Sequence, residues 1–122
     1  MKNGLALMYV KERTPEICIA AVSQNGWALQ YVKKQTPEIC FAAVMQEVGA
    51  LLYVQDQTFA LCVAAVLKNS YVLQYIKKGT PELYMAAVMR DGLALRHIHD
   101  QTPAICSAAI RQNKNAAQFV LI

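Results

Sequence analysis

Apolar and polar positions along this chain repeat with a period of 22 residues, and this periodicity determines the predicted fold. A threonine begins each period, and a proline follows it in four periods of five. Six residues after the threonine comes a pair of alanines, followed by valine or isoleucine. The threonines are Thr14, Thr36, Thr58, Thr80 and Thr102, and the alanine pairs begin at Ala20, Ala42, Ala64, Ala86 and Ala108. We therefore interpret the chain as a row of equivalent structural units.

The first part of each period, typified by residues 36–44, predicts an α-helix that we call helix A. Threonine is a favoured N-cap, and proline is favoured at the first helical position because its missing N–H would have no partner there. Residues 17–22 are apolar around the full turn, so neighbouring elements must cover this helix on most sides. We expect helix A to be the inner element, with its paired alanines allowing close approach of adjacent repeats.

A second, shorter helix, helix B, is predicted after Asn25 and Gly26, where glycine is expected to end helix A in the left-handed conformation. Helix B is predicted to run from about Trp27 to Lys34. Its apolar residues alternate with glutamine and lysine, which indicates a half-exposed helix whose final lysines suit the negative end of the helix dipole. Helices this short are unstable alone, so their stability must come from the stacking of repeats.

These features predict an all-α fold, a right-handed α-solenoid of two-helix repeats with about 11 short helices. The predicted organisation is one domain, residues 1–122, because a chain of this length is too short for two ordinary domains. Its parts are a half repeat at 1–13 and repeats at 14–35, 36–57, 58–79, 80–101 and 102–122. Strands are the competing assignment, but a parallel β-helix or a leucine-rich horseshoe would require period-two alternation or a Leu-x-x-Leu-x-Leu pattern, and neither is present.

Composition and charge narrow the class further. The chain is 56% apolar with a formal charge of +4, and no Gly-, Ser- or Pro-rich tract interrupts it, so we expect order almost end to end. The longest uncharged run, residues 17–32, includes five Ser, Gln, Asn or Gly residues and falls short of the roughly 20 apolar residues that span a bilayer. The first ten residues lack the pattern of a secretory signal. We therefore predict a cytoplasmic protein without a membrane partner.

Four cysteines occupy one position of the repeat, with Tyr84 in the remaining place. They are Cys18, Cys40, Cys62 and Cys106. Stacked helices lie roughly 8–10 Å apart, whereas a disulfide requires Cα atoms within roughly 7 Å. We expect buried thiols that serve as small apolar residues and form no disulfides.

Two segments of the repeat, residues 25–32 (NGWALQYV) and 36–44 (TPEICFAAV), carry a family resemblance. They resemble the bacterial and giant-virus repeats of domain of unknown function 4116, and the likeness covers essentially the whole chain. The resemblance implies a helical-repeat scaffold. Because that family has no established activity, it implies no catalytic residues.

Candidate catalytic and metal-binding groups are few. His97, His99 and Asp100 are residue types that bind metal ions, but at about 100° per residue the two histidines point to nearly opposite sides of helix B. No serine or cysteine has a recognisable base and orienting group, as nucleophilic catalysis requires. We predict a non-enzymatic protein with no cofactor and no metal site.

The positions that differ between repeats are the best indication of function, because a contact surface varies where a scaffold position is uniform. Exposed Met, Leu, aromatic and Arg side chains are typical of protein-binding surfaces. The sequence therefore predicts a protein-interaction scaffold, an adaptor or an inhibitor, although relaxed surface variation would produce the same pattern. The candidate partner-binding residues are Trp27, Tyr71, Leu93, Met45, Leu67, Met89, Leu52 and Arg96.

Nucleic-acid binding is the alternative function. Lysines recur at the end of helix B, where they would form a phosphate-binding stripe. They are Lys11, Lys33, Lys34, Lys77 and Lys78. Glu12, Asp56 and Asp100 interrupt this file, and helix C-termini favour lysine without any ligand. The recurring tyrosines, such as Tyr31 and Tyr53, are consistent either with a stacking platform for bases or with packing between repeats.

Both ends of the chain predict self-association. The N-terminal half repeat has no preceding helix A, and the last residues, Phe119 to Ile122, are apolar where other repeats carry lysine. Uncapped solenoid ends expose apolar faces, so we expect a homodimer formed through the terminal repeats.

Overall fold

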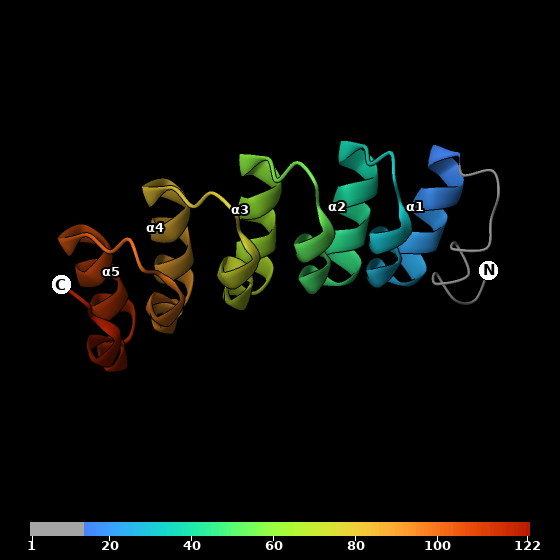
Figure 1. Cartoon of the computed structure of the whole chain (residues 1–122). Helices are drawn as coiled ribbons and strands as arrows, with labels where there is room; N and C mark the ends of the chain where they lie inside the picture. The colour runs from blue at the N-terminus through green and yellow to red at the C-terminus, as the bar shows by residue number, and fades with distance from the viewer. Residues whose placement is uncertain (1–13) are drawn as a thin grey trace. The chain divides into compact units, whose positions relative to one another are not determined.

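The structure, a computed structural model, describes residues 14–122, in which helices joined by short connecting segments are present and no strand occurs (Figure 1). Ten helices alternate in this range between ten-residue α-helices and six-residue 3-10 helices. The α-helices are α1 (Pro15–Gln24), α2 (Pro37–Gln46), α3 (Phe59–Lys68), α4 (Pro81–Arg90) and α5 (Pro103–Gln112). The 3-10 helices are η2 (Gly26–Tyr31), η3 (Val48–Tyr53), η4 (Ser70–Tyr75), η5 (Gly92–His97) and η6 (Lys114–Phe119). The predicted all-α repeat fold is confirmed, whereas the half repeat at 1–13 lies outside the described residues.

Each α-helix begins where the sequence predicts. The threonine before it accepts a hydrogen bond through Oγ1 from the backbone N–H three residues later, at 3.2–3.3 Å in all five helices. In four of them proline occupies the first helical position, and α3 begins with Phe59 instead. The N-terminus of every described α-helix is therefore encoded locally.

One residue joins each α-helix to its 3-10 helix and caps both. The N–H of Asn25 donates to the Ala21 carbonyl at 3.0 Å and ends α1, while its Oδ1 accepts the N–H of Trp27 at 3.0 Å and begins η2. The equivalent residues are Glu47, Asn69, Asp91 and Asn113. The predicted glycine C-cap is wrong, because no glycine in the described range has positive φ. Gly26 and Gly92 are instead the first residues of 3-10 helices.

Helix B is a 3-10 helix and is shorter than predicted. In η2 the N–H of Val32 donates to the carbonyl of Leu29, three residues earlier, at 3.0 Å. The helix ends at Tyr31, so Lys33 and Lys34 lie beyond it in a bend rather than in its last turn. A 3-10 helix rises about 2.0 Å per residue. Six residues therefore span about 12 Å, whereas six residues of an α-helix would span about 9 Å. The longer 3-10 form is closer to the length of the ten-residue α-helix beside it, which is roughly 15 Å.

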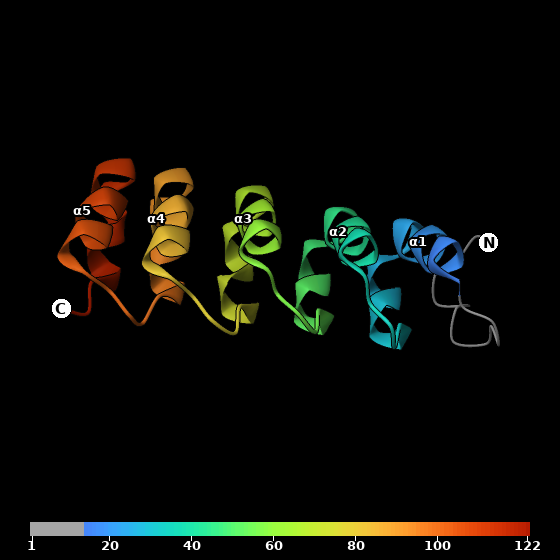
Figure 2. The same cartoon turned by 90° about the horizontal axis from the view of Figure 1, so that it is seen from above.

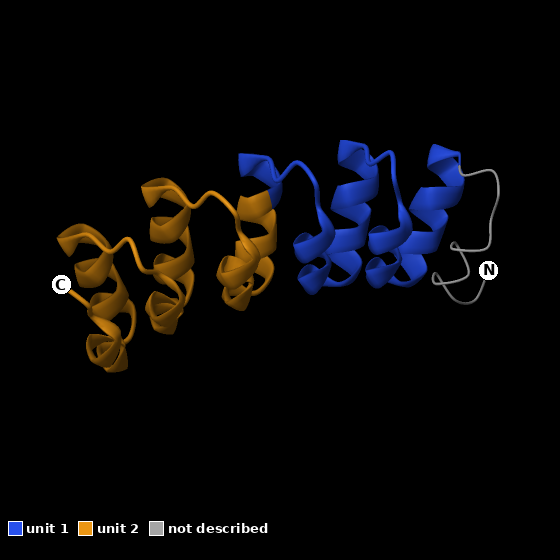
Figure 3. Ribbon diagram, viewed as in Figure 1, with its two compact units in different colours: residues 1–61 blue, residues 62–122 orange. Residues whose placement is uncertain are grey.

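Two compact units divide the chain inside α3, one ending at Leu61 and the other beginning at Cys62 (Figure 3). Within each unit the α-helices form one layer and the 3-10 helices a second (Figure 2). In the first unit α1 packs against α2 and η2 against η3; in the second, α4 packs against α5 and η5 against η6. Helices α2 and α5 also contact the 3-10 helix of the preceding repeat, η2 and η5 respectively.

The second alanine of each pair forms the centre of this packing. Ala21, Ala43, Ala65, Ala87 and Ala109 are each 0% exposed. The first alanines, from Ala20 to Ala108, are exposed or half-buried. The expectation that both alanines provide the close approach therefore holds only for the second. Consecutive helical positions differ by about 100°, and the core-facing side of the helix includes the second alanine and, in four repeats, the valine that follows it. The first alanine lies at the edge of that side.

Glycine and glutamine form a joint between adjacent repeats. The N–H of Gly26 donates to Oε1 of Gln46 in the next repeat at 2.6 Å, and Gly92 donates to Gln112 at the same distance. A Cβ atom on Gly26 would lie 2.5 Å from the carbonyl oxygen of Ala43. These glycines are therefore required for close approach of the next α-helix, not for positive φ.

A second glutamine clamps the backbone of the following repeat. Gln35 donates from Nε2 to the Tyr53 carbonyl at 2.9 Å and accepts at Oε1 from the N–H of Gln55 at 2.9 Å. The thiol of Cys40 also donates to this Oε1 at 3.3 Å. Gln101 makes the same contacts with Phe119, Leu121 and Cys106 in the second unit. A half-buried amide thus pairs backbone groups of the next connecting segment.

Gly79, at the end of the third repeat, and Tyr84, in the fourth, replace this glutamine and cysteine. A Cβ atom on Gly79 would overlap the hydroxyl and ring of Tyr84, so the phenol fills the space that a glutamine side chain would need. Burial, with the carboxylate of Asp100, raises the pKa of Tyr84 and keeps its hydroxyl protonated. The two exceptions to the repeat therefore compensate for each other sterically.

The four cysteines are buried thiols, and no disulfide joins them, as predicted. Burial raises the pKa of Cys40 and of Cys62, and the carboxylate of Asp56 contributes at Cys40. The thiolate, which is the reactive form, is therefore disfavoured by the same packing that shields the sulfur.

We expect the native thiols to react slowly with an alkylating or disulfide reagent. Fewer than about one thiol per chain should be modified in the time in which the urea-unfolded chain is modified at all four cysteines. Raising the pH to about 9 should accelerate the native reaction of Cys40 and Cys62 less than that of a cysteine peptide, because burial raises the pKa of these two thiols. Rapid modification of the native chain at all four sites would contradict the burial of this position.

Candidate functional site

The predicted partner-binding residues divide between the two layers and do not form one surface. Met45, Leu67 and Met89 lie on α-helices. The others lie on 3-10 helices: Trp27, Leu52, Tyr71, Leu93 and Arg96. We call the exposed surface of the first layer the α face and that of the second layer the 3-10 face, within each unit.

Several large apolar side chains on the α face are exposed to solvent, including two that the sequence analysis did not select. Met89 is 66% exposed and Leu67 is also exposed, whereas Met45 is half-buried. Phe41, on α2, is 49% exposed, and Phe59 at the start of α3 is exposed as well. Sequence reasoning missed both phenylalanines. The signal was present, because the position of Phe41 holds isoleucine, valine, methionine or serine in the other repeats.

An apolar groove opens on the α face of the first unit, beside α2. It has a volume of about 520 Å³ and is lined by Pro37, Cys40, Phe41, Ala60 and Leu61, among others. The charged residues in its lining are both acidic, Glu38 and Asp56. A cavity of this size accommodates several side chains of a partner.

A second groove lies between α4 and α5 in the other unit. It has a volume of about 470 Å³ and is lined by Met85, Met89, Ala104, Ala108, Arg111 and Gln112. Its charged lining residue is a cation, Arg111. The two grooves thus resemble each other in apolar character and have opposite charge.

A shared substitution accompanies both grooves. The second residue of the α-helix is glutamate in three helices, Glu16, Glu38 and Glu82, and alanine at Ala60 and Ala104. These two alanines line the first and the second groove respectively. Replacing a long carboxylate by a methyl group leaves space and removes negative charge where each groove opens.

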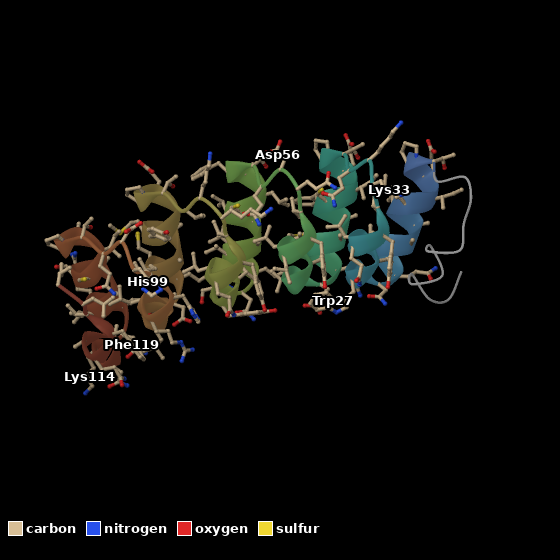
Figure 4. All side chains as sticks on the ribbon, in the orientation of Figure 1. Trp27, Lys33, Asp56, His99, Lys114 and Phe119 are labelled. Atoms are coloured by element: carbon tan, nitrogen blue, oxygen red, sulfur yellow. The ribbon has the colours of Figure 1, made fainter. Side chains whose placement is uncertain are left out.

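The 3-10 face carries aromatic residues that pack against one another. Trp27 meets Tyr53 edge to face, with 6.2 Å between ring centroids, and the guanidinium of Arg96 lies 6.0 Å from the Phe119 centroid. Trp27 lies on this face, whereas Lys33 and Asp56 lie on connecting segments (Figure 4). Trp27 and Arg96 therefore each contact an aromatic ring of the following repeat.

The remaining candidates of the 3-10 face are partly enclosed. Tyr71 lies edge to face with Tyr75, with 5.9 Å between centroids, and Tyr71 and Leu93 are both half-buried. Leu52, by contrast, is 48% exposed. These contacts favour the interpretation of the tyrosines as packing residues over that of a stacking platform.

The lysines of the alternative prediction are exposed but not continuous. Lys33 and Lys34 lie in the first unit and Lys77 and Lys78 in the second, while Lys11 lies outside the described residues. One repeat after each pair, the corresponding position holds a carboxylate, Asp56 or Asp100. Within residues 14–122, each unit therefore carries one exposed pair of these lysines rather than a continuous file.

The histidines occupy different environments. His97 is half-buried, and burial together with Arg96 lowers its pKa, against a smaller opposing effect of Asp91. His99 is exposed in the segment that follows η5. Among residues 14–122, no group of three or more His, Cys, Asp or Glu side chains is positioned to hold a metal ion.

None of the helices between residues 14 and 122 has the length and apolar character needed to cross a membrane. At the C-terminal end Leu121 and Ile122 are exposed, while the N-terminal half repeat lies outside the described range. Self-association through the terminal repeats stays a prediction.

Comparison of the chain with protein-family models, with curated proteins and with solved structures finds no match. The resemblance to domain of unknown function 4116 therefore stays a prediction.

Proposed function

We propose that the chain is a non-catalytic protein-interaction scaffold, an adaptor or an inhibitor, that binds a protein partner along its α face. The observation that carries this proposal is the apolar groove beside α2, where half of the Phe41 side chain remains exposed. Large aromatic and methionine side chains next to a concave apolar surface are the usual anchors of protein recognition.

The thiol content supports a location for this function. Four buried thiols without a disulfide are typical of a reducing compartment, so we propose that the protein acts in the cytoplasm.

The proposal is tested by selecting peptides from a random library on the immobilised full-length chain. The selected peptides are then measured against wild type, Phe41→Ser and Leu52→Ser. The two residues form a matched pair, because their side chains are 49% and 48% exposed on opposite layers. We expect Phe41→Ser to weaken binding by about tenfold or more, as for an anchor residue, and Leu52→Ser to leave it unchanged.

Two results would overturn this proposal. One is the absence of any peptide enriched over a surface without protein. The other is a loss of binding in Leu52→Ser but not in Phe41→Ser, which would place recognition on the 3-10 face. Urea unfolding of both variants checks that they remain folded.

Nucleic-acid binding is the alternative, and the distribution of charge provides its support. Residues 62–122 carry seven lysines and arginines against three acidic residues, so the net positive charge belongs to this half of the chain. If phosphate contacts dominate, affinity for a single-stranded oligonucleotide falls steeply with salt and falls further in Lys77→Glu/Lys78→Glu. Binding that is weak at low salt and unaffected by the double substitution excludes this function.

A further inference from the structure

We propose that the second groove, between α4 and α5, binds the apolar edge of an acidic amphipathic helix of a partner protein. This inference rests on the proposed scaffold function and names the class of partner for one of its grooves.

The groove has the shape needed to receive a row of side chains. Met85 and Met89 stand four residues apart on α4, and Ala104 and Ala108 stand four residues apart on the adjacent α5. The two residues of each pair are about one helical turn, roughly 6 Å, apart along their helix. The two helices therefore form the two walls of the groove. The alanines form a shallow wall and the methionines a tall one.

Methionine suits this role. Met89 is 66% exposed, whereas Met45 and Met85, the other methionines in the described part of the chain, are half-buried. An unbranched thioether side chain adjusts to partners of different shape, and such residues are frequent at adaptable binding surfaces. Covering Met89 would remove apolar surface from water and favour association.

The backbone of the partner determines that it should be helical. Both walls are α-helices, whose central N–H and C=O groups are already paired along the helix. An extended peptide lying between them would bury backbone groups without hydrogen-bond partners, at a considerable cost. A helix satisfies its own backbone groups and presents side chains at three- and four-residue spacing to such a groove.

The charge of the groove determines that the partner should be acidic. Arg111 is the cation of the lining, and its Nε donates to the carbonyl of Ser107 at 3.4 Å, which uses one of its five N–H donors. The alanine at position 104 removes the first-turn glutamate found in α1, α2 and α4. A carboxylate beside the apolar edge of the partner would meet Arg111.

The first groove provides a built-in comparison within the same chain. Its charged lining residues are Glu38 and Asp56, so an acidic helix should be repelled there. Substitutions in the first groove should therefore leave binding of an acidic helix unchanged.

The test uses the full-length chain and two synthetic probe peptides, each of about 18 residues so that the helix is long enough to form. Both carry the same leucine stripe at three- and four-residue spacing; one has glutamate and the other lysine at the flanking positions. Fluorescence polarisation measures binding of each peptide to wild type, Arg111→Glu, Ala108→Leu and Phe41→Ser.

We expect the glutamate peptide to bind wild type at least about tenfold more tightly than the lysine peptide, because only the glutamate peptide complements the charge of Arg111. Arg111→Glu should weaken binding of the glutamate peptide by about tenfold and reduce the difference in affinity between the two peptides. Ala108→Leu should abolish binding by filling the groove, and Phe41→Ser should leave it unchanged. Circular dichroism melting of each variant checks folding.

The inference is overturned if neither peptide binds, if both bind equally, or if binding survives Ala108→Leu and Arg111→Glu in folded protein. A failure of this kind is distinguishable from failure of the scaffold function. Library peptides whose binding depends on Phe41 would still be selected in that case, through the other groove.

Discussion

Substituting Gly26 by valine should destabilise the chain by about 3 kcal/mol or more, among the largest effects of any single substitution that leaves the helix caps intact. A Cβ atom there would lie 2.5 Å from the Ala43 carbonyl oxygen and 2.9 Å from Cβ of Glu47. Overpacking of this kind costs about 1–3 kcal/mol, and displacing the 2.6 Å bond from the Gly26 N–H to Gln46 adds about 1 kcal/mol. Equilibrium urea unfolding measures the loss.

Ala20→Val is the control for this substitution. Ala20 is the exposed alanine of its pair, so the added methyl groups meet solvent, and the cost should stay below about 1 kcal/mol from helix propensity. If Gly26→Val unfolded at the same urea concentration as wild type, the close contact between η2 and α2 would be wrong.

Gly79→Gln should also destabilise the chain, by about 1–3 kcal/mol, although glutamine is the residue that most other repeats carry at this position. The new side chain would overlap the Tyr84 ring, which occupies the space of the glutamine clamp in this repeat. Tyr84→Cys alone should cost a similar amount, because it leaves a cavity where the ring was.

The double variant Gly79→Gln/Tyr84→Cys restores the pair found as Gln35 with Cys40 and as Gln101 with Cys106. It should recover most of the stability, with a coupling free energy of about 2 kcal/mol in a double-mutant cycle, because the two residues share one space. Additive destabilisation would show that Gly79 and Tyr84 do not compensate for each other.

The glutamine clamp was accessible to sequence analysis and was not recognised. Glutamine recurs at 35, 57 and 101, and the exceptional glycine at 79 coincides with the exceptional tyrosine at 84. Periodicity showed which residues are equivalent. It did not show that Gln35 reaches Tyr53 and Gln55, because that contact joins residues about one repeat apart through space.

The exposure of the candidate partner-binding residues was predicted in part, whereas their role in binding stays a prediction. Variation between repeats identified Met89 and Leu52 as exposed, yet it also selected Leu93 and Tyr71, which are half-buried. Variation reports that a position is free to change and does not report which layer it faces. Variation between repeats did not distinguish the two layers. The candidate partner-binding residues are therefore divided between the α face and the 3-10 face.

The sequence by itself determined the repeat, which is visible as a 22-residue period, and the α-helical starts, which depend on interactions within a few residues. The bond from each capping threonine to the N–H three residues later is local, and so is the preference for proline after it. Tertiary structure decided the 3-10 form of the second helix, the role of Gly26 and the grooves. Each of these is set by an adjacent repeat: the Ala43 carbonyl excludes a side chain at residue 26, and neighbouring α-helices form the walls of a groove. Local propensity carries no information about the distance to the next repeat, and that distance, fixed by the fully buried alanines, selects among the conformations that the local sequence allows.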